Sequence, residues 1–275
     1  MPERLTGFLG MPRGNFLPQI MVAPNGARRT KDDHPNLPIT IPELVSDAIA
    51  CHKAGADAIH VHVRDIKGQH TLDIGLYREV MKELETTVPD MLVQLTTESA
   101  GIYSPSEQRN ILPKLGAQSV SVAIKEFLAD GEWESAGRAY HHTFETGTDI
   151  QHILYTTKDV DLLARMVAKG IVPSIRLQIL LVMGTYGGTP ARFEDLEPLL
   201  SHVEKEIPNT ELAVCAFGRQ ETRILSATFK YGHNIRVGFE NNLYHDDGKI
   251  AKDNASRVTE VLHFISGRRV DSNQT

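Results

Sequence analysis

Two histidines separated by one residue, His60 and His62, lie in the segment Ala-Asp-Ala-Ile-His-Val-His-Val-Arg-Asp, residues 56–65. The alternation of small and β-branched residues there predicts a β-strand. Side chains alternate faces along a strand, so the two imidazoles project on the same side, about 7 Å apart along the backbone. They could converge on one metal ion. A hydrogen-bonded pair of core histidines is an equally good interpretation of this spacing alone.

A second polar strand end lies near the C-terminus, in the segment Asn-Ile-Arg-Val-Gly-Phe-Glu-Asn-Asn-Leu, residues 234–243. Strand alternation places Arg236 and Glu240 on one face. A carboxylate at the end of an apolar strand is costly unless it is paired or bound to a metal. With two neutral histidines it would complete a three-ligand set with open positions, which is typical of catalytic zinc. The alternative is a buried ion pair between Glu240 and Arg236.

The elements that must position these residues form a regular alternation. A capping-box spacing of Thr40 and Glu43 begins the first helix, and Gly55 stands where its C-terminal cap belongs. A long irregular insert that contains Trp133 is expected at roughly residues 126–151. Strands are expected at residues 19–23, 58–63, 91–96, 119–124, 152–155, 174–180, 211–217 and 234–239, and helices at 40–55, 74–86, 105–115, 158–169, 193–207, 220–231 and 254–265.

This alternation predicts a single-domain α/β fold, a (β/α)8 TIM barrel of residues 20–275 that follows an N-terminal extension, residues 1–19. An open doubly wound sheet would normally show a glycine-rich turn after its first strand, and Pro24-Asn25-Gly26-Ala27 is not such a turn. A barrel builds its active site from the C-terminal ends of its strands. The residues expected at or near those ends are His60, His62, Thr96, Thr97, Glu98, Ser121 and Glu240.

Composition narrows the possible partners. The net charge of −6 argues against a nucleic-acid surface and gives no support for binding to anionic membranes. No apolar stretch approaches the length that spans a bilayer, and residues 1–19 have no apolar core of a signal peptide. Cys51 and Cys215 imply no disulfide framework, and neither is expected to take part in a site. We therefore expect a cytoplasmic protein.

Several segments, in their order and spacing, resemble the β-keto acid cleavage enzymes, the family typified by the 3-keto-5-aminohexanoate cleavage enzyme. The similarity covers roughly residues 20–268. Its segments are Ala23-Pro-Asn-Gly-Ala27, His34-Pro-Asn-Leu-Pro-Ile-Thr40, Ala54-Gly-Ala-Asp-Ala-Ile-His-Val-His-Val-Arg-Asp65, Gln94-Leu-Thr-Thr97, Val182-Met-Gly-Thr-Tyr-Gly-Gly-Thr-Pro190 and Arg236-Val-Gly-Phe-Glu-Asn-Asn242.

The resemblance implies a zinc-bearing TIM barrel, usually a homotetramer, that condenses a β-keto acid with acetyl-CoA to give acetoacetate and a new acyl-CoA. It implies Zn²⁺ on His60, His62 and Glu240, and it makes Arg236 the catalytic arginine. Thr96 would contact the substrate carboxylate. Thr97 and Ser121, at the same expected rim, are further candidates for substrate binding. Zinc would act as a Lewis acid on the β-keto acid and stabilise its enolate.

The sequence departs from the family pattern after the zinc-binding glutamate. The family usually has an aspartate there, and this chain has Asn241, which cannot take up a proton. Glu98, where many relatives have glycine, could supply a catalytic carboxylate instead. Its alternative is an exposed glutamate of a loop.

A second departure follows Gly26-Ala27. The aminohexanoate enzyme has a glutamate there that pairs with the substrate amine, whereas this chain has Arg28. An arginine would repel an ammonium group and attract a second carboxylate. We therefore expect a substrate without an amine, such as the keto diacids 3-oxoadipate or 3-oxoglutarate. Alternatively, Arg28 points to solvent or to the phosphates of CoA.

The pattern of residues is also compatible, to different degrees, with three other functions. An amidohydrolase-type zinc enzyme fits poorly, because its His-x-His lies on the first strand and further histidines and an aspartate complete its site. A metal-dependent aldolase shares the stabilisation of an enolate but needs no CoA. A non-catalytic relative that retains the metal is a third possibility, because Asn241 replaces the acid.

Overall fold

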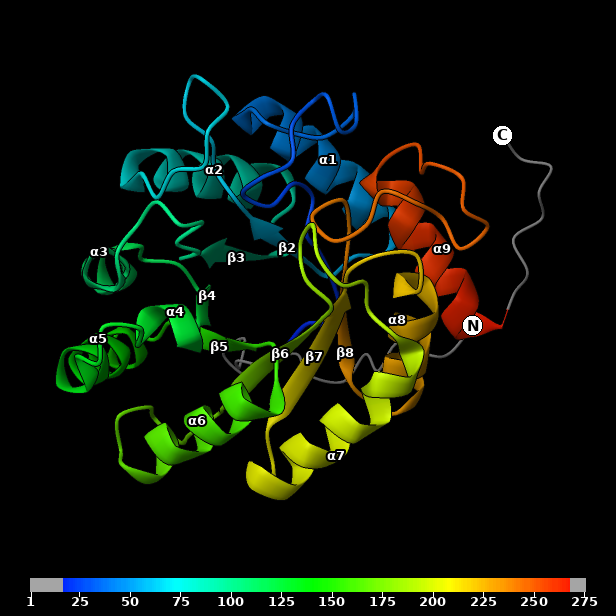
Figure 1. Ribbon diagram of the computed structural model, residues 1–275. Helices are drawn as coiled ribbons and strands as arrows, with labels where there is room; N and C mark the ends of the chain where they lie inside the picture. The colour runs from blue at the N-terminus through cyan, green and yellow to red at the C-terminus, as the bar shows by residue number, and fades with distance from the viewer. Residues whose placement is uncertain (1–16, 268–275) are drawn as a thin grey trace.

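The computed structural model describes residues 17–267. Residues 1–16 of the predicted N-terminal extension and residues 268–275 of the predicted barrel domain lie outside this range. Eight parallel strands close into a barrel in sequential order, and helices surround it (Figure 1). The predicted fold class, a (β/α)8 TIM barrel, is therefore confirmed. The strands are β1 (Ile20–Val22), β2 (Ala58–Val61), β3 (Leu92–Thr96), β4 (Ser119–Ala123), β5 (Asp149–Leu154), β6 (Gln178–Met183), β7 (Glu211–Ala216) and β8 (Asn234–Val237).

The outer layer is helical. The predicted start and end of α1 are confirmed: Thr40 and Glu43 form a capping box, and Gly55 caps the helix with φ +110°. The helices are α1 (Ile41–Ala54), α2 (Ile74–Thr87), α3 (Pro105–Ile111), α4 (Ile124–Phe127), α5 (Trp133–Glu145), α6 (Thr157–Ala168), α7 (Leu196–Glu206), α8 (Glu221–Lys230) and α9 (Asn254–Ser266), with 3₁₀ turns at Leu112–Lys114 and Phe193–Asp195.

The irregular insert predicted at residues 126–151 is wrong. Helix α5 fills most of that segment, and β5 begins within it at Asp149. Ala136, Tyr140 and Thr143 are buried at helical spacing, so α5 packs as an ordinary barrel helix. Gly137 and the run His141-His142-Thr143 have low helix propensity, and for this reason the sequence pattern did not predict a helix here.

The inside of the barrel has a polar and an apolar half. His60, Gln94 and Gln151, on β2, β3 and β5, are buried polar residues. On β6, Gln178 pairs in register with Gln151 and is also buried and polar, but nearer the C-terminal ends of β6 and β7 the buried residues of one cluster are apolar: Leu180, Val182, Ala213 and Cys215. At the C-terminal end of the barrel, the β6 and β7 side of the interior is thus apolar.

Within residues 17–267, no helix combines the length and the apolar character that crossing a bilayer requires.

Candidate active site

The predicted metal ligands meet at the C-terminal end of the barrel. His60 lies on β2 and His62 directly after it, and Glu240 follows β8. The Nε2 atoms of the two histidines are 3.1 Å apart. Glu240 Oε2 is 3.9 Å from His60 Nε2 and 3.7 Å from His62 Nε2. Tetrahedral ligands ~2.0 Å from a zinc ion are about 3.3 Å from one another, so this set is close to the required geometry.

The chemical state of these residues also fits a metal ion. Burial, and then the positive charge of Arg236, holds the pKa of His60 well below its ordinary value. Burial likewise lowers the pKa of His62. Both imidazoles are therefore neutral at pH 7, which is the form that binds metals. Glu240 Oε2 is buried and has no hydrogen-bond partner among the described residues. An orphaned carboxylate oxygen beside two neutral imidazoles favours a cation at this point.

Two glycines allow Glu240 to reach the histidines. Gly238 has φ +146°, and a Cβ there would lie 2.4 Å from the carbonyl oxygen of Ala23. The Glu240 N–H donates to that same oxygen at 3.1 Å. Gly26 has φ +63°, and a Cβ there would lie 2.6 Å from Glu240 Cγ. The close approach of the segments after β1 and β8 therefore needs glycine at both positions.

Arg236 points into the same site and is 3% exposed. Its Nη2 donates to Glu240 Oε1 at 3.2 Å, so the expected ion pair is present and uses the oxygen that does not face the histidines. Its Nε and Nη1 have no partner among the described residues. Unpaired buried guanidinium donors are costly, and they would bind an anion well. Ser121 Oγ, also buried, has no partner either.

The sulfur of Cys215 contacts both Arg236 and Asn241. Asn241 Nδ2 is 3.8 Å from Cys215 Sγ, and Arg236 Nη2 is 3.5 Å from the same sulfur. From the sequence we expected neither cysteine to take part in a site, and the structure places Cys215 in contact with two residues of the candidate site. Its inward position follows from strand alternation along β7, but its partners come from β8 and could not be inferred from spacing. Burial raises the pKa of Cys215 to about 11, so it remains a thiol at pH 7.

Glu98 lies on the opposite side of the histidines from Arg236, after β3. Its backbone N–H donates to Thr96 Oγ1 at 2.9 Å. Its Oε2 is 3.9 Å from His62 Nδ1, and its side chain is 25% exposed. Burial, and then the charge of Glu240, raises the pKa of Glu98 to about 7. Glu98 therefore faces the site, and the alternative of an exposed loop residue is wrong.

The two threonines after β3 have different contacts. Thr97 Oγ1 donates to the carbonyl oxygen of Ser121 at 2.8 Å, so its hydroxyl holds β3 to the end of β4. Thr96 Oγ1 accepts from Glu98 and keeps its own hydrogen free to donate. Of the pair, Thr96 has the hydroxyl that can contact a ligand.

Arg28 lies at the rim of the site, with a side chain that is 49% exposed. Its Nη2 is 3.9 Å from Glu98 Oε1. Its guanidinium carbon is 5.7 Å from the centre of the Tyr186 ring, and that of Arg29 is 5.4 Å from the same ring. Arg28 thus contacts a site residue and still has donors available to a ligand.

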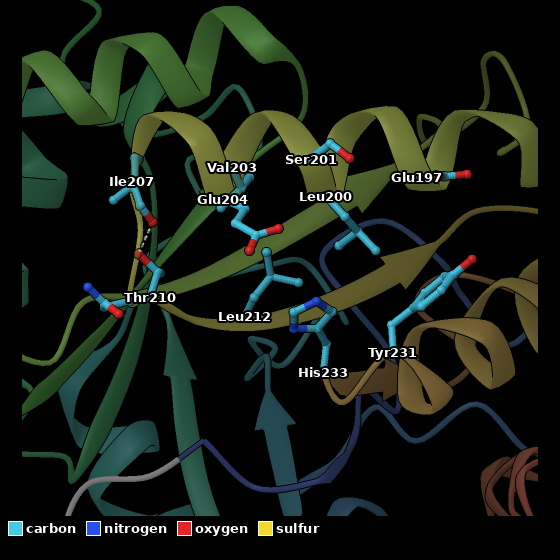
Figure 2. A pocket seen from close by; sticks show the side chains of 11 residues that line it. Glu197, Leu200, Ser201, Val203, Glu204, Ile207, Thr210, Leu212, Tyr231 and His233 are labelled. Carbon is cyan, nitrogen blue, oxygen red and sulfur yellow. Dashed lines mark hydrogen bonds between the residues drawn. The ribbon is translucent and has the colours of Figure 1, made fainter.

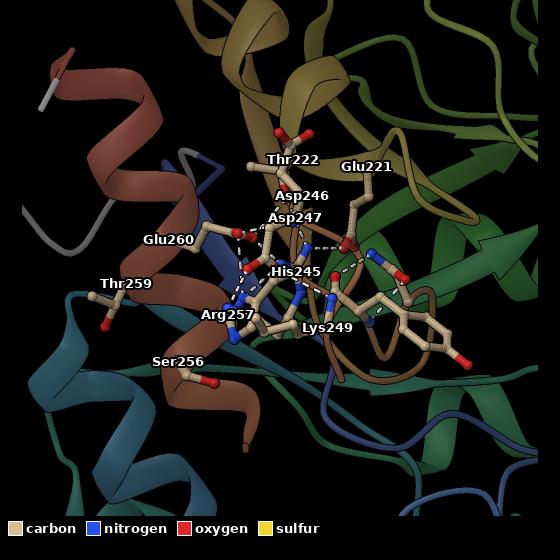
Figure 3. Close-up of polar contacts among 12 residues, drawn as sticks. Glu221, Thr222, His245, Asp246, Asp247, Lys249, Ser256, Arg257, Thr259 and Glu260 are labelled. Carbon is tan, nitrogen blue, oxygen red and sulfur yellow. Dashed lines mark hydrogen bonds and ion pairs between the residues drawn. The ribbon is translucent and has the colours of Figure 1, made fainter. Parts of the chain in front are cut away.

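Charged residues of α8 and α9 form an ionic network that contacts the loop that carries Glu240 (Figure 3). Arg257 on α9 is fully buried, and its Nη2 donates to Glu221 Oε2 at 2.6 Å. Its Nη1 contacts Glu260 Oε2. Glu260 Oε1 in turn accepts the backbone N–H of Asp246 at 2.9 Å. The network ties α8 and α9 to the loop that connects β8 with α9 (Figure 3).

A hollow between α7 and α8 is not a rival active site. Figure 2 shows that residues of α7, such as Leu200 and Glu204, line it, together with Tyr231 and His233, which follow α8. Asn209 and Thr210, also in its lining, precede β7. The hollow therefore lies beside the N-terminal ends of β7 and β8, whereas barrel enzymes carry their chemistry at the C-terminal ends.

The chain is similar to proteins of one enzyme family. A sequence profile described as "beta-keto acid cleavage enzyme" matches residues 19–271. The chain is 27% identical to the 3-keto-5-aminohexanoate cleavage enzyme of Acetoanaerobium sticklandii, over 89% of this chain and 90% of that protein. It is 24% identical to the 3-oxoadipate:acetyl-CoA acetyltransferase of Cupriavidus necator, over 88% and 86%.

Among solved structures, the chain is similar to the complex of ObcA with oxaloacetate, with a TM-score of 0.65 and 16% identity. The similarity covers 85% of this chain and 64% of ObcA, so the chain spans less than two thirds of that protein. This comparison supports the barrel fold alone.

Proposed function

The chain belongs to the beta-keto acid cleavage enzyme family, whose members are enzymes of the acyltransferase type, and on this premise we propose its reaction. It condenses a β-keto acid with acetyl-CoA, giving acetoacetate and a new acyl-CoA, with Zn²⁺ on His60, His62 and Glu240. The observation that carries the proposal is the orphaned Glu240 Oε2 facing two neutral histidines, beside an arginine with free donors. A bound metal ion would supply Lewis-acid stabilisation of the substrate's developing negative charge.

The chain's own residues account for binding of the acid. Among the residues that the structure describes, Arg236 Nε and Nη1 and Ser121 Oγ are donors without a partner in the buried part of the site. Thr96 has a free hydroxyl hydrogen. These groups suit the carboxylate and the keto oxygen of a β-keto acid, because buried donors lower the energy of an anion most where water is excluded. Thr97 supports the substrate only indirectly, through its hydrogen bond to β4.

We propose that Glu98 holds the proton removed from the carbon between the keto and carboxyl groups. Asn241 has no proton-accepting group, although it occupies the usual position of the acid. Glu98 is the other carboxylate near the histidines, with Oε2 3.9 Å from His62 Nδ1. Asn241 would then act through its amide, which contacts Cys215 and keeps an unpartnered Oδ1.

Arg28 supports a substrate without an amine, and a keto diacid such as 3-oxoadipate in particular. Its half-exposed guanidinium has a distant contact with Glu98, which leaves hydrogen-bond donors for a carboxylate at the rim. A relative described as acting on 3-oxoadipate is consistent with this choice. Comparing kcat/KM for a keto diacid and an amino keto acid tests it, with Arg28→Met as the matched variant. A preference of the unmodified enzyme for the amine would refute the assignment.

The reaction itself is tested with purified, zinc-loaded protein, acetyl-CoA and a panel of β-keto acids, with detection of acetoacetate. Turnover that continues without acetyl-CoA would favour a metal-dependent aldolase. Bound metal without any turnover would favour a non-catalytic relative. His62→Ala should lose metal and activity together, and retention of both would refute the site. We also propose a cytoplasmic homotetramer, which light scattering on the purified protein checks for mass.

A further inference from the structure

Below the candidate metal site, β3 contributes an amide that contacts one of the two histidines. Gln94 is 0% exposed and pairs with His60 in the register of β2 and β3. Its Oε1 is 2.9 Å from His60 Nδ1. Its Nε2 donates to Ser119 Oγ at 3.2 Å and to Gln151 Oε1 at 3.1 Å. Both hydrogens of the amide therefore have acceptors, one on β4 and one on β5.

This arrangement determines which nitrogen of His60 carries the proton. With Gln151 in its observed orientation, the reversed amide of Gln94 would bring two acceptor oxygens, those of Gln94 and Gln151, within 3.1 Å of one another. With the carbonyl oxygen of Gln94 toward the ring, His60 Nδ1 must carry the hydrogen. The lone pair then lies on Nε2, the atom that is 3.1 Å from His62 Nε2 and 3.9 Å from Glu240 Oε2.

The second histidine has no equivalent support. His62 Nδ1 has no hydrogen-bond partner among residues 17–267. Glu98 Oε2, 3.9 Å away, is beyond hydrogen-bond distance. The two histidines therefore differ: a buried side-chain acceptor holds the Nδ1–H of His60, whereas no described residue accepts a hydrogen bond from His62 Nδ1.

We propose that Gln94 is a positioning residue that keeps His60 in its Nδ1–H tautomer, with Nε2 directed at the metal. The inference rests on the proposed function, because it assumes that His60 binds a metal ion. Hydrogen bonds from the second ring nitrogen to a buried acceptor orient histidine ligands, and their loss typically weakens metal binding by about 10- to 100-fold. Neither Gln94 nor its role follows from the metal-ligand motif itself.

The test compares the unmodified protein with Gln94→Leu, which removes the acceptor. Gln108→Leu is the matched control, because Gln108 is also fully buried and its Nε2 donates to the carbonyl oxygen of Thr97, away from the metal ligands. Metal affinity is measured by competition with a chromophoric chelator, using Zn²⁺ and Co²⁺. We expect Gln94→Leu to bind about 10- to 100-fold more weakly, and Gln108→Leu to stay within about threefold of the unmodified protein.

A second measurement separates this inference from the proposed function. Nitrogen-15 spectra of metal-free protein report the tautomer of His60 directly, and we expect Nδ1–H in the unmodified protein and in Gln108→Leu, with a mixed population in Gln94→Leu. Failure of the unmodified protein to bind metal would overturn the proposed function, while the spectra would still decide whether Gln94 sets the tautomer. An Nε2–H tautomer in the unmodified protein, or a folded Gln94→Leu with unchanged spectrum and affinity, would overturn the inference.

Discussion

Replacing Gly26 by alanine tests the geometry of the site at a residue that has no chemistry of its own. The added Cβ would lie 2.6 Å from Glu240 Cγ, whereas ordinary contact begins at 3.4 Å. Glu240 or the backbone that faces it must therefore move by roughly 0.8 Å. Metal sites tolerate changes of only about 0.2 Å in ligand distance. We expect Gly26→Ala to bind Zn²⁺ at least about 10-fold more weakly.

A matched control separates this displacement from backbone strain. Gly116 has φ +64°, almost the same as the +63° of Gly26, but a Cβ there meets nothing within 4 Å. In both variants alanine must adopt the left-handed conformation, at about 1–2 kcal/mol, offset by roughly 0.4–1 kcal/mol from the restricted unfolded chain. Only Gly26→Ala should also displace a metal ligand.

The assay is chelator competition for metal affinity, together with urea unfolding of the metal-free proteins. We expect similar affinity for Gly116→Ala and the unmodified protein, and a larger loss of stability for Gly26→Ala than for Gly116→Ala. Equal metal affinity of the two alanine variants would show that Glu240 is not held where the argument requires. Equal stability would show that the loops relax without cost.

Three further predictions concern charged residues. Arg257→Met should lower the free energy of unfolding by about 3–5 kcal/mol in urea titrations, because it leaves Glu221 and Glu260 buried without their partner. Glu98→Gln should lower kcat by about 10²- to 10⁴-fold while metal affinity measured by chelator competition is unchanged; unchanged kcat would exclude Glu98 as the proton acceptor. Asp47 lies against Asn254, Cys51 and Asp253, and burial raises its pKa to about 7. The carboxyl of the unfolded chain therefore loses its proton at lower pH than that of the folded protein, and the free energy of unfolding falls as pH rises from about 4 to 7. Asp47→Asn should lose this part of the decline when unfolding is followed from pH 5 to 8.

Strand alternation and the common direction of barrel strands account for the parts of the site that could be predicted. His60 and His62 share a face because they are two residues apart on a strand, and Glu240 joins them because all eight strands end at the same rim. These relations need only the spacing within each strand and the order of the elements.

The remaining features depend on contacts between strands and on loop conformation. Gln94 and Cys215 lie in apolar strands, and their partners are set by the register with β2 and β8, which spacing within a single strand does not give. The distance between Glu98 and Arg28 depends on two loops. Helix α5 was missed because packing, rather than propensity, stabilises it.

The charges of the site explain how Glu240 can be both an ion-pair partner and a metal ligand. Arg236 uses Oε1, and Oε2 remains unpartnered beside the histidines, so the two roles use different oxygens. The charges of Arg236 and Glu240 balance, and a divalent ion would leave the pocket strongly positive, which suits an anionic β-keto acid and the enolate formed from it. Relative to the family pattern that the sequence resembles, Asn241 lacks one negative charge on the β8 side, and Glu98 has an additional one on the β3 side. The total charge is thereby preserved, but the carboxylate stands on the other side of the metal ligands, so we expect Glu98 to take up the proton from the side of β3.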